Sequence, residues 1–304
     1  MAISAKDVQK LREMTGVGMM DCKKALGESN GDFDKAIEWL REKGLAASAK
    51  KAGRIAAEGM AYAGVIDGVG VVVEVNAETD FVAKNEKFTD FVKGVAATVA
   101  ACAPADLDAL MECKYNGADL TVTQQQQEMV LVIGENIKVR RFARFADGVS
   151  VPYIHAGGKI GVLVNLEVTG GIDATEIGKD LAMQIAALNP RFLDKSQVTQ
   201  DVLDGEKKIL MAQLANDPKM AGKPDKVKEN IVAGKINKFY AENCLLQQAF
   251  VKDGDVTVEQ YMTAAAKKLG GTVTLKDAVR FEKGEGIEKK QENFAEEIAK
   301  QLGK

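Results

Sequence analysis

The sequence predicts an α+β protein built from several units, and three observations carry this prediction. The chain has 304 residues, 46% of them hydrophobic and 28% charged, which is long enough for two or more domains. Roughly the first 45 residues have helical periodicity, whereas strand alternation begins at residue 60. A strand–strand–helix pattern then occurs twice, which implies a duplicated core.

We therefore expect a three-helix N-terminal module, a duplicated α+β core, an inserted helical hairpin and a C-terminal helical module. The hairpin is expected to interrupt the second core subdomain. In chain order, the expected ranges are 1–54 for the N-terminal module and linker, 55–148 for core subdomain one, 149–194 and 229–283 for core subdomain two, 195–228 for the hairpin, and 284–304 for the C-terminal module.

Start and stop signals place three short helices in the N-terminal module. Ser4 is a suitable N-cap for the first helix, which Gly16 ends. Asp32 can cap the third helix, which we expect to end at Gly44. The small and basic residues that follow, "LAASAKKAGRIAAEG", are expected to form a linker.

The first core subdomain begins with a strand hairpin. The apolar runs "MAYAGVI" and "GVVVEVNAE" flank Asp67-Gly68, a pair that favours a tight turn between strands. A helix is expected to follow and to end near Pro104. The remaining elements of this subdomain are a helix and then a strand, "QQQQEMVLVIGEN" and "IKVRRFARF".

The second subdomain repeats the first. "YAGVIDGVGVVVEV" (62–75) and "YIHAGGKIGVLVNL" (153–166) both begin with tyrosine, and Gly70 and Gly161 open an apolar strand at the same offset. Each strand leads into a helix of similar length, the second being "ATEIGKDLAMQIAALNP". Two related sheets backed by helices are therefore expected.

Two long helical stretches flank the turn-rich "NDPKMAGKPD" and predict an antiparallel hairpin. Its expected apolar stripes are Val198, Val202, Ile209 and Leu210 on the first helix, and Val227, Ile231 and Ile236 on the second. A helix, a strand and an amphipathic tail complete the chain.

Composition and motifs exclude several classes of protein. The N-terminus lacks the apolar region of a secretory signal, and no apolar run approaches the ~18 residues that a membrane span needs. The four cysteines are scattered and form no CxxC pair, so we expect neither disulfides nor zinc, and a cytoplasmic location. A net charge of −3 argues against nucleic acid as the main ligand.

The search for a chemical site finds no enzyme constellation. Each Gly-Lys pair lacks the glycine five residues earlier that a phosphate-binding loop needs. The single histidine, His155, fits a hairpin or interface residue better than a general base. "KVRRFAR" (138–144) places Lys138, Arg140 and Arg144 on one strand face, which is expected to be solvated or, alternatively, to meet phosphates. We expect no cofactor.

One turn has unusual chemistry. "ETDFVAKNEKF" (78–88) carries Asp80 and Phe81 where a strand passes into a helix. The second copy has "VTGGI" at the same place, with the small residues that such turns prefer. The fold thus does not require a phenylalanine there. Phe81 either folds back into the core or points outward to bind another protein.

Several segments resemble the elongation factor Ts family. "LREMTGVGMMDCKKAL" (11–26) and "ETDFVAKN" (78–85) are similar to the two signature segments of that family. Further similar segments follow in the family's order: "IGENIKVRR", "IHAGGKIGVLV", "KINKFYAENCLLQQAFVKD" and "VRFEKGEGIEK". The resemblance spans almost the whole chain.

The resemblance implies a guanine-nucleotide exchange factor for elongation factor Tu, without a catalytic chemical site. It implies an N-terminal module similar to ubiquitin-associated domains, and a tip that enters the GTPase and dislodges the nucleotide's Mg²⁺. The residues that it implies are Thr79, Asp80, Phe81 and Val82 at the tip, with Arg12, Met19, Met20 and His155 as further partner contacts. Without the resemblance, Met19 and Met20 would be read as bundle core. A homodimer is a further expectation, and direct nucleotide binding is not expected.

Two other classes stay open at this point. A nucleic-acid-binding protein would use "KVRRFAR" and "KKAGR", and its binding would depend steeply on salt. A scaffold would bind through the helical hairpin and would tolerate the loss of Phe81. An enzyme is the weakest alternative because the sequence offers no site.

Overall fold

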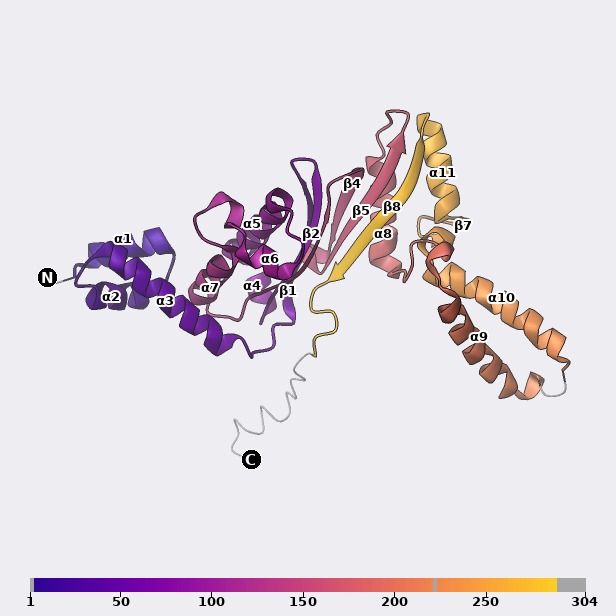
Figure 1. Ribbon diagram of the computed structural model, residues 1–304, viewed down its shortest axis with the longest axis horizontal. Helices are drawn as coiled ribbons and strands as arrows, with labels where there is room; N and C mark the ends of the chain where they lie inside the picture. Colours follow the sequence, from indigo (N-terminus) through magenta and orange to yellow (C-terminus); the bar gives the residue numbers. More distant parts are fainter. Residues whose placement is uncertain (1–2, 221–222, 289–304) are drawn as a thin grey trace.

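Three helices open the chain: α1 (Ala5–Thr15), α2 (Met19–Glu28) and α3 (Phe33–Lys51). We describe them from a computed structural model, which covers residues 3–220 and 223–288. Ser4 and Asp7 form a capping box on α1, and Gly16 ends that helix at φ +68°, as predicted. The helices form one end of an elongated molecule (Figure 1).

The predicted end of the third helix is wrong. Helix α3 continues past Gly44 to Lys51, so the connection to the core is much shorter than the expected linker. Gly44 is buried, and a Cβ atom there would lie 3.4 Å from the backbone oxygen of Gln127, which lies on the helix Val122–Ile133. The glycine therefore permits a close approach between two helices, and it is not a stop signal.

The first sheet has the antiparallel order β1-β2-β3. Its strands are β1 (Glu58–Ile66), β2 (Val69–Ala77) and β3 (Lys138–Phe145). Asp67 and Gly68 both have positive φ and form the predicted tight turn. Its helices are α4 (Asp80–Ala83), α5 (Glu86–Cys102), α6 (Leu107–Glu112) and α7 (Val122–Ile133).

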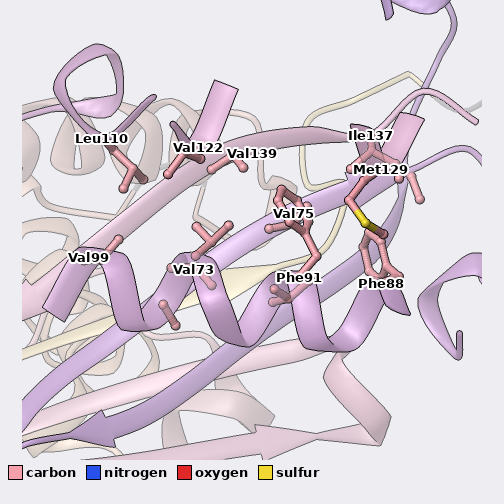
Figure 2. Packing of buried hydrophobic residues seen from close by; sticks show 14 of the residues in the cluster. Val73, Val75, Phe88, Phe91, Val99, Leu110, Val122, Met129, Ile137 and Val139 are labelled. Carbon is pink, nitrogen blue, oxygen red and sulfur yellow. The ribbon is translucent and has the colours of Figure 1, made fainter. Parts of the chain in front are cut away.

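Helix α5 packs its apolar face on this sheet. Figure 2 shows Phe88 and Phe91 of α5 beside Val73 and Val75 of β2, with Met129 of α7 closing the cluster. The alternating valines of β2 point to this core, as their period of two requires. The packed core fixes the end of β2, from which the candidate tip begins.

The second sheet has the antiparallel order β4-β5-β8 and faces the first. Its strands are β4 (Val149–His155), β5 (Ile160–Thr169) and β8 (Thr272–Glu282), with α8 (Thr175–Leu188) and α11 (Val258–Leu269) packed beside them. A small two-stranded sheet has β6 (Ala249–Phe250) and β7 (Asp253–Thr257). Single 3₁₀ turns lie at Tyr115–Gly117, Ala156–Gly158, Lys195–Gln197, Pro218–Met220 and Leu245–Gln247.

The two glycines of the sequence repeat have matching roles between the sheets. A Cβ atom on Gly70 would lie 2.3 Å from Ser150 Oγ, and one on Gly161 would lie 3.0 Å from the Ala61 carbonyl oxygen. Each glycine thus lets its strand approach the first strand of the other sheet. The coarse prediction of helices combined with antiparallel sheets is confirmed.

Helices α9 (Gln200–Ala215) and α10 (Asp225–Asn243) form a hairpin that projects from the end opposite the N-terminal module (Figure 1). The residues packed between them include Leu210, Leu214, Val232 and Ile236. The predicted stripe is wrong at Ile209 and Val227, which are 54% and 38% exposed.

Two expected boundaries do not fall at the ends of described elements. Residue 228 falls inside the continuous helix α10, so the expected end of the hairpin does not coincide with an element boundary. Most of the expected C-terminal module, together with the amphipathic tail, lies outside the described residues. Within 3–220 and 223–288, no helix is both long and apolar enough to cross a bilayer.

Candidate partner-binding site

Phe81 is the most exposed large hydrophobic residue of the described chain, with 80% of its surface accessible. It lies on α4, a single helical turn directly after β2. The next two residues, Val82 and Ala83, are buried and anchor this turn to the core. The alternative that Phe81 folds back into the core is therefore wrong.

Polar contacts define the rest of the tip. Thr79 has an extended backbone and is the N-cap residue of α4. Lys84 Nζ lies 3.3 Å from Asp80 Oδ2, and both side chains are solvent exposed, so this pair is a weak one. Asn85 then caps α5 by accepting a hydrogen bond from the Lys87 amide. The tip is thus a short helical turn between a buried strand and a capped helix.

The carboxylate of Glu135 supports the base of the tip. It accepts hydrogen bonds from the backbone amides of Glu78, at 3.1 Å, and Thr79, at 3.0 Å. The Thr79 hydroxyl also donates to it at 2.7 Å. Sequence reasoning missed Glu135, although the segment "IGEN" that contains it was part of the family resemblance.

Met19 and Met20 begin α2 and are 51% and 74% exposed. The buried residues of that helix are instead Cys22, Ala25 and Leu26. The alternative that the two methionines form the core of the bundle is therefore wrong. They belong to a free apolar surface at the start of α2.

The structure brings the N-terminal contacts close to the tip. Arg12 and Met19 line a surface hollow that Lys87 of α5 also borders. Lys87 borders a second hollow as well, which Phe81 and Val82 line. Two of the predicted N-terminal residues thus share a neighbour with the tip, although no spacing in the sequence could have revealed this.

His155 is exposed at the end of β4, where Tyr153 Oη lies 3.1 Å from its Nδ1. The loop that follows it packs on β1, because a Cβ atom on Gly158 would lie 2.6 Å from Met60. The start of β1 pairs with the end of β2, from which the tip emerges. His155 therefore lies at the same end of the sheets as the tip, but it does not line either hollow.

The basic strand face is not the solvated surface that the sequence predicted. Arg140 and Arg141 of β3 donate to the fully buried carboxylate of Glu74, at 2.9 and 2.5 Å. Burial alone would raise the pKa of Glu74, but hydrogen bonds from the Gly284 amide and both arginines outweigh it and lower the pKa. Both arginines are thus occupied within the protein, which weakens the nucleic-acid alternative.

Arg144 donates to the backbone oxygen of Ala100, whereas Lys138 is exposed. Glu74 is a second residue that sequence reasoning missed, because its partners lie 66 and 67 positions away along the chain.

Among the described residues, no group of three or more metal-ligating side chains comes together.

Comparison with known proteins shows strong similarity. The family model described as "Elongation factor TS" matches residues 78–285. A protein of Clostridium botulinum (strain Eklund 17B / Type B) named "Elongation factor Ts" is 49% identical over 309 residues, which covers 99% of this chain and all of the relative. Relatives of the same name from Syntrophotalea carbinolica and Trichlorobacter lovleyi are 49% and 50% identical, and 98% and 100% of this chain is covered, with 99% of each relative.

Proposed function

Because this chain belongs to the elongation factor Ts family, we propose that it is the guanine-nucleotide exchange factor for elongation factor Tu. In this proposal it binds the GDP-bound GTPase, displaces Mg²⁺ and promotes GDP release, so that GTP can bind. The protein carries out no bond chemistry itself and acts by binding. It would work in the cytoplasm, where translation takes place, and would not bind nucleotide directly.

The observation that supports this most strongly is the exposure of Phe81 on an anchored turn. A phenylalanine that is 80% exposed gains little from its own fold, so its apolar surface is available to a partner. In the proposal, Phe81 and Val82 enter a gap between helices of the GTPase, and Asp80 makes polar contacts at the mouth of that gap. Thr79 fixes where the turn begins.

Exchange follows from thermodynamic linkage. A GTPase holds its nucleotide partly through Mg²⁺ bound to the phosphates. A partner that prefers the nucleotide-free shape must weaken nucleotide binding by the same factor by which nucleotide weakens the partner. The burial of one phenylalanine contributes only about 1.5–3 kcal/mol, which is roughly one to two decades in an equilibrium constant. Further contacts must supply the rest.

Those contacts are proposed at Arg12, Met19, Met20 and His155. The two exposed methionines suit an apolar groove on a partner helix, because methionine adapts to irregular surfaces. Arg12 adds a charge at the rim of the surface hollow that Met19 also lines.

The expected domain division and a possible homodimer also belong to the proposal. The hairpin is now defined as residues 200–243, the span of α9 and α10.

Fluorescent GDP release tests the proposal directly. Purified elongation factor Tu is loaded with a fluorescent GDP analogue and chased with excess GDP, with and without this protein. We expect substoichiometric protein to accelerate release over several turnovers. Release at the intrinsic rate with saturating protein would contradict the proposed function.

A further inference from the structure

Hydrogen bonds to a distant part of the chain hold the connection between β2 and the tip. Glu135 follows α7, and its carboxylate receives three hydrogen bonds from residues 78 and 79. The next residue, Asn136, also holds this connection, because its backbone amide donates to the Glu78 carboxylate at 2.6 Å. The Asn136 side chain donates to the Arg54 carbonyl oxygen at 2.8 Å.

The tip needs outside support of this kind. Helix α4 has four residues, and one isolated turn is not stable by itself because nucleation of a helix is unfavourable. Its N-cap residue, Thr79, makes no side-chain hydrogen bond to the amides of the turn, and its hydroxyl donates to Glu135. Solvent surrounds most of the Phe81 ring. The direction of Phe81 is therefore set by how its backbone is held on each side.

Buried Val82 holds the far side of Phe81, and Glu135 holds the near side. At the corresponding turn of the second unit, the chain uses Gly170 and Gly171 at positive φ. A glycine turn of that kind reverses the chain without presenting a large side chain. Of these two corresponding turns, the hydrogen bonds with Glu135 and Asn136 thus support the one with an exposed aromatic residue.

We propose that Glu135 is a positioning residue for Phe81, which holds the backbone at residues 78 and 79 so that the aromatic ring is pre-organised for its partner. Glu135 does not contact the partner and acts only through the tip. This inference rests on the proposed exchange function. A tip that adopts the competent conformation only part of the time acts in proportion to that fraction, while the N-terminal contacts still hold the complex together.

The test compares Glu135→Ala with the wild-type protein in fluorescent GDP release from elongation factor Tu. Hydrogen bonds to a carboxylate are among the stronger ones, so the loss of three should lower the competent fraction about tenfold or more. The maximal release rate should fall by that factor. The half-saturating concentration should change less than about twofold, because the contacts of the N-terminal module remain. Glu112→Ala, at an exposed glutamate that ends α6, is the matched control and should behave as wild type.

A double-mutant cycle with Phe81→Ala separates positioning from general damage to the fold. If Glu135 acts through Phe81, Glu135→Ala should slow exchange in the wild-type background but not in the Phe81→Ala background. An equal further loss in both backgrounds would overturn the proposal. Exchange by Glu135→Ala at the wild-type rate would overturn it too, if Phe81→Ala is slow.

A readout without the GTPase keeps this inference distinct from the proposed function. The amides of Lys84 and Asn85 bond to the carbonyl oxygens of Phe81 and Val82, so their hydrogen exchange reports on the tip. Glu135→Ala should speed that exchange about tenfold and leave the β1–β2 amides unchanged. Unchanged protection of the tip would refute the positioning role. Failure of the wild-type protein to accelerate GDP release from elongation factor Tu would instead refute the exchange function.

Discussion

The ammonium group of Lys87 donates a hydrogen bond of 3.2 Å to the backbone oxygen of Gly16. Lys87 lies on α5, directly after the tip, and Gly16 closes α1 in the N-terminal module. The bond therefore links the two surfaces that are proposed to bind the GTPase. It is exposed, so its contribution to folding is small, but it helps to set the spacing between the surfaces.

We predict that Lys87→Met changes the free energy of unfolding by less than about 0.5 kcal/mol, because the side chain is at the surface. GDP release should slow roughly twofold to fivefold, since the two surfaces are no longer held together by this bond. Lys93→Met on the same helix is the control and should leave exchange unchanged. Urea unfolding and GDP release measure both quantities, and a large stability loss would contradict this account.

The buried carboxylate of Glu74 should control stability. We predict that Glu74→Gln lowers the free energy of unfolding by roughly 3 kcal/mol, near the low end for a broken buried ion pair because both arginines reach solvent. The same substitution at exposed Glu167 is the matched control and should cost less than about 0.5 kcal/mol. Urea unfolding at pH 7 measures the difference, and equal losses at the two positions would contradict the prediction.

Glu74 should also make stability depend on pH. Its pKa is lowered in the folded protein, so at acidic pH the unfolded chain binds the proton more readily. The stabilisation is complete above the unfolded glutamate pKa of about 4.3 and is lost as the pH falls from there through the lower folded pKa. Wild type should therefore lose more stability than Glu74→Gln between about pH 5 and pH 3, the range that spans the unfolded pKa and extends below it. If the free energy of unfolding had the same pH dependence in wild type and Glu74→Gln, this role would be contradicted.

Met20 should matter for binding and not for folding. Met20→Ala removes an exposed side chain, so stability should change by less than about 0.5 kcal/mol, while GDP release should require several-fold more protein for half-saturation. Leu26→Ala on the same helix removes a fully buried side chain and should cost about 2–5 kcal/mol. If Met20→Ala lowered stability as Leu26→Ala does, Met20 would be a core residue.

The outer part of the helical hairpin should be dispensable for basal exchange. Glu206 and Lys235 border a common hollow at the base of the hairpin, so residues 208–234 can be replaced by a short Gly/Ser turn. We expect the folded variant to accelerate GDP release within about twofold of wild type, because the tip belongs to the first sheet. Loss of exchange in a variant with an intact fold would show that the hairpin takes part.

Local signals in the sequence predicted much of this structure. Ser4 and Gly16 bound the first helix, and Asp67-Gly68 turns the first strand pair, because caps and tight turns depend on adjacent residues. The helix end at Gly44 was mispredicted because the reason for that glycine is a distant helix.

The candidate site was predicted only in part, for the same reason. The repeat drew attention to Phe81, since the second copy does without it. The support from Glu135 and the pairing of Glu74 with Arg140 join residues more than 50 positions apart. Contacts of this kind leave no periodic pattern in one sequence. They emerge only when strands and helices pack.

The most direct test of the account is Phe81→Ala, measured by thermal unfolding and by GDP release from elongation factor Tu. Phe91→Ala, at a buried position of α5, is the matched control and should cost about 3–5 kcal/mol of folding free energy. Phe81→Ala should instead leave the melting temperature unchanged and slow exchange tenfold or more, since burial of the ring contributes only in the complex. Exchange at the wild-type rate, or a drop in melting temperature like that of Phe91→Ala, would contradict the account.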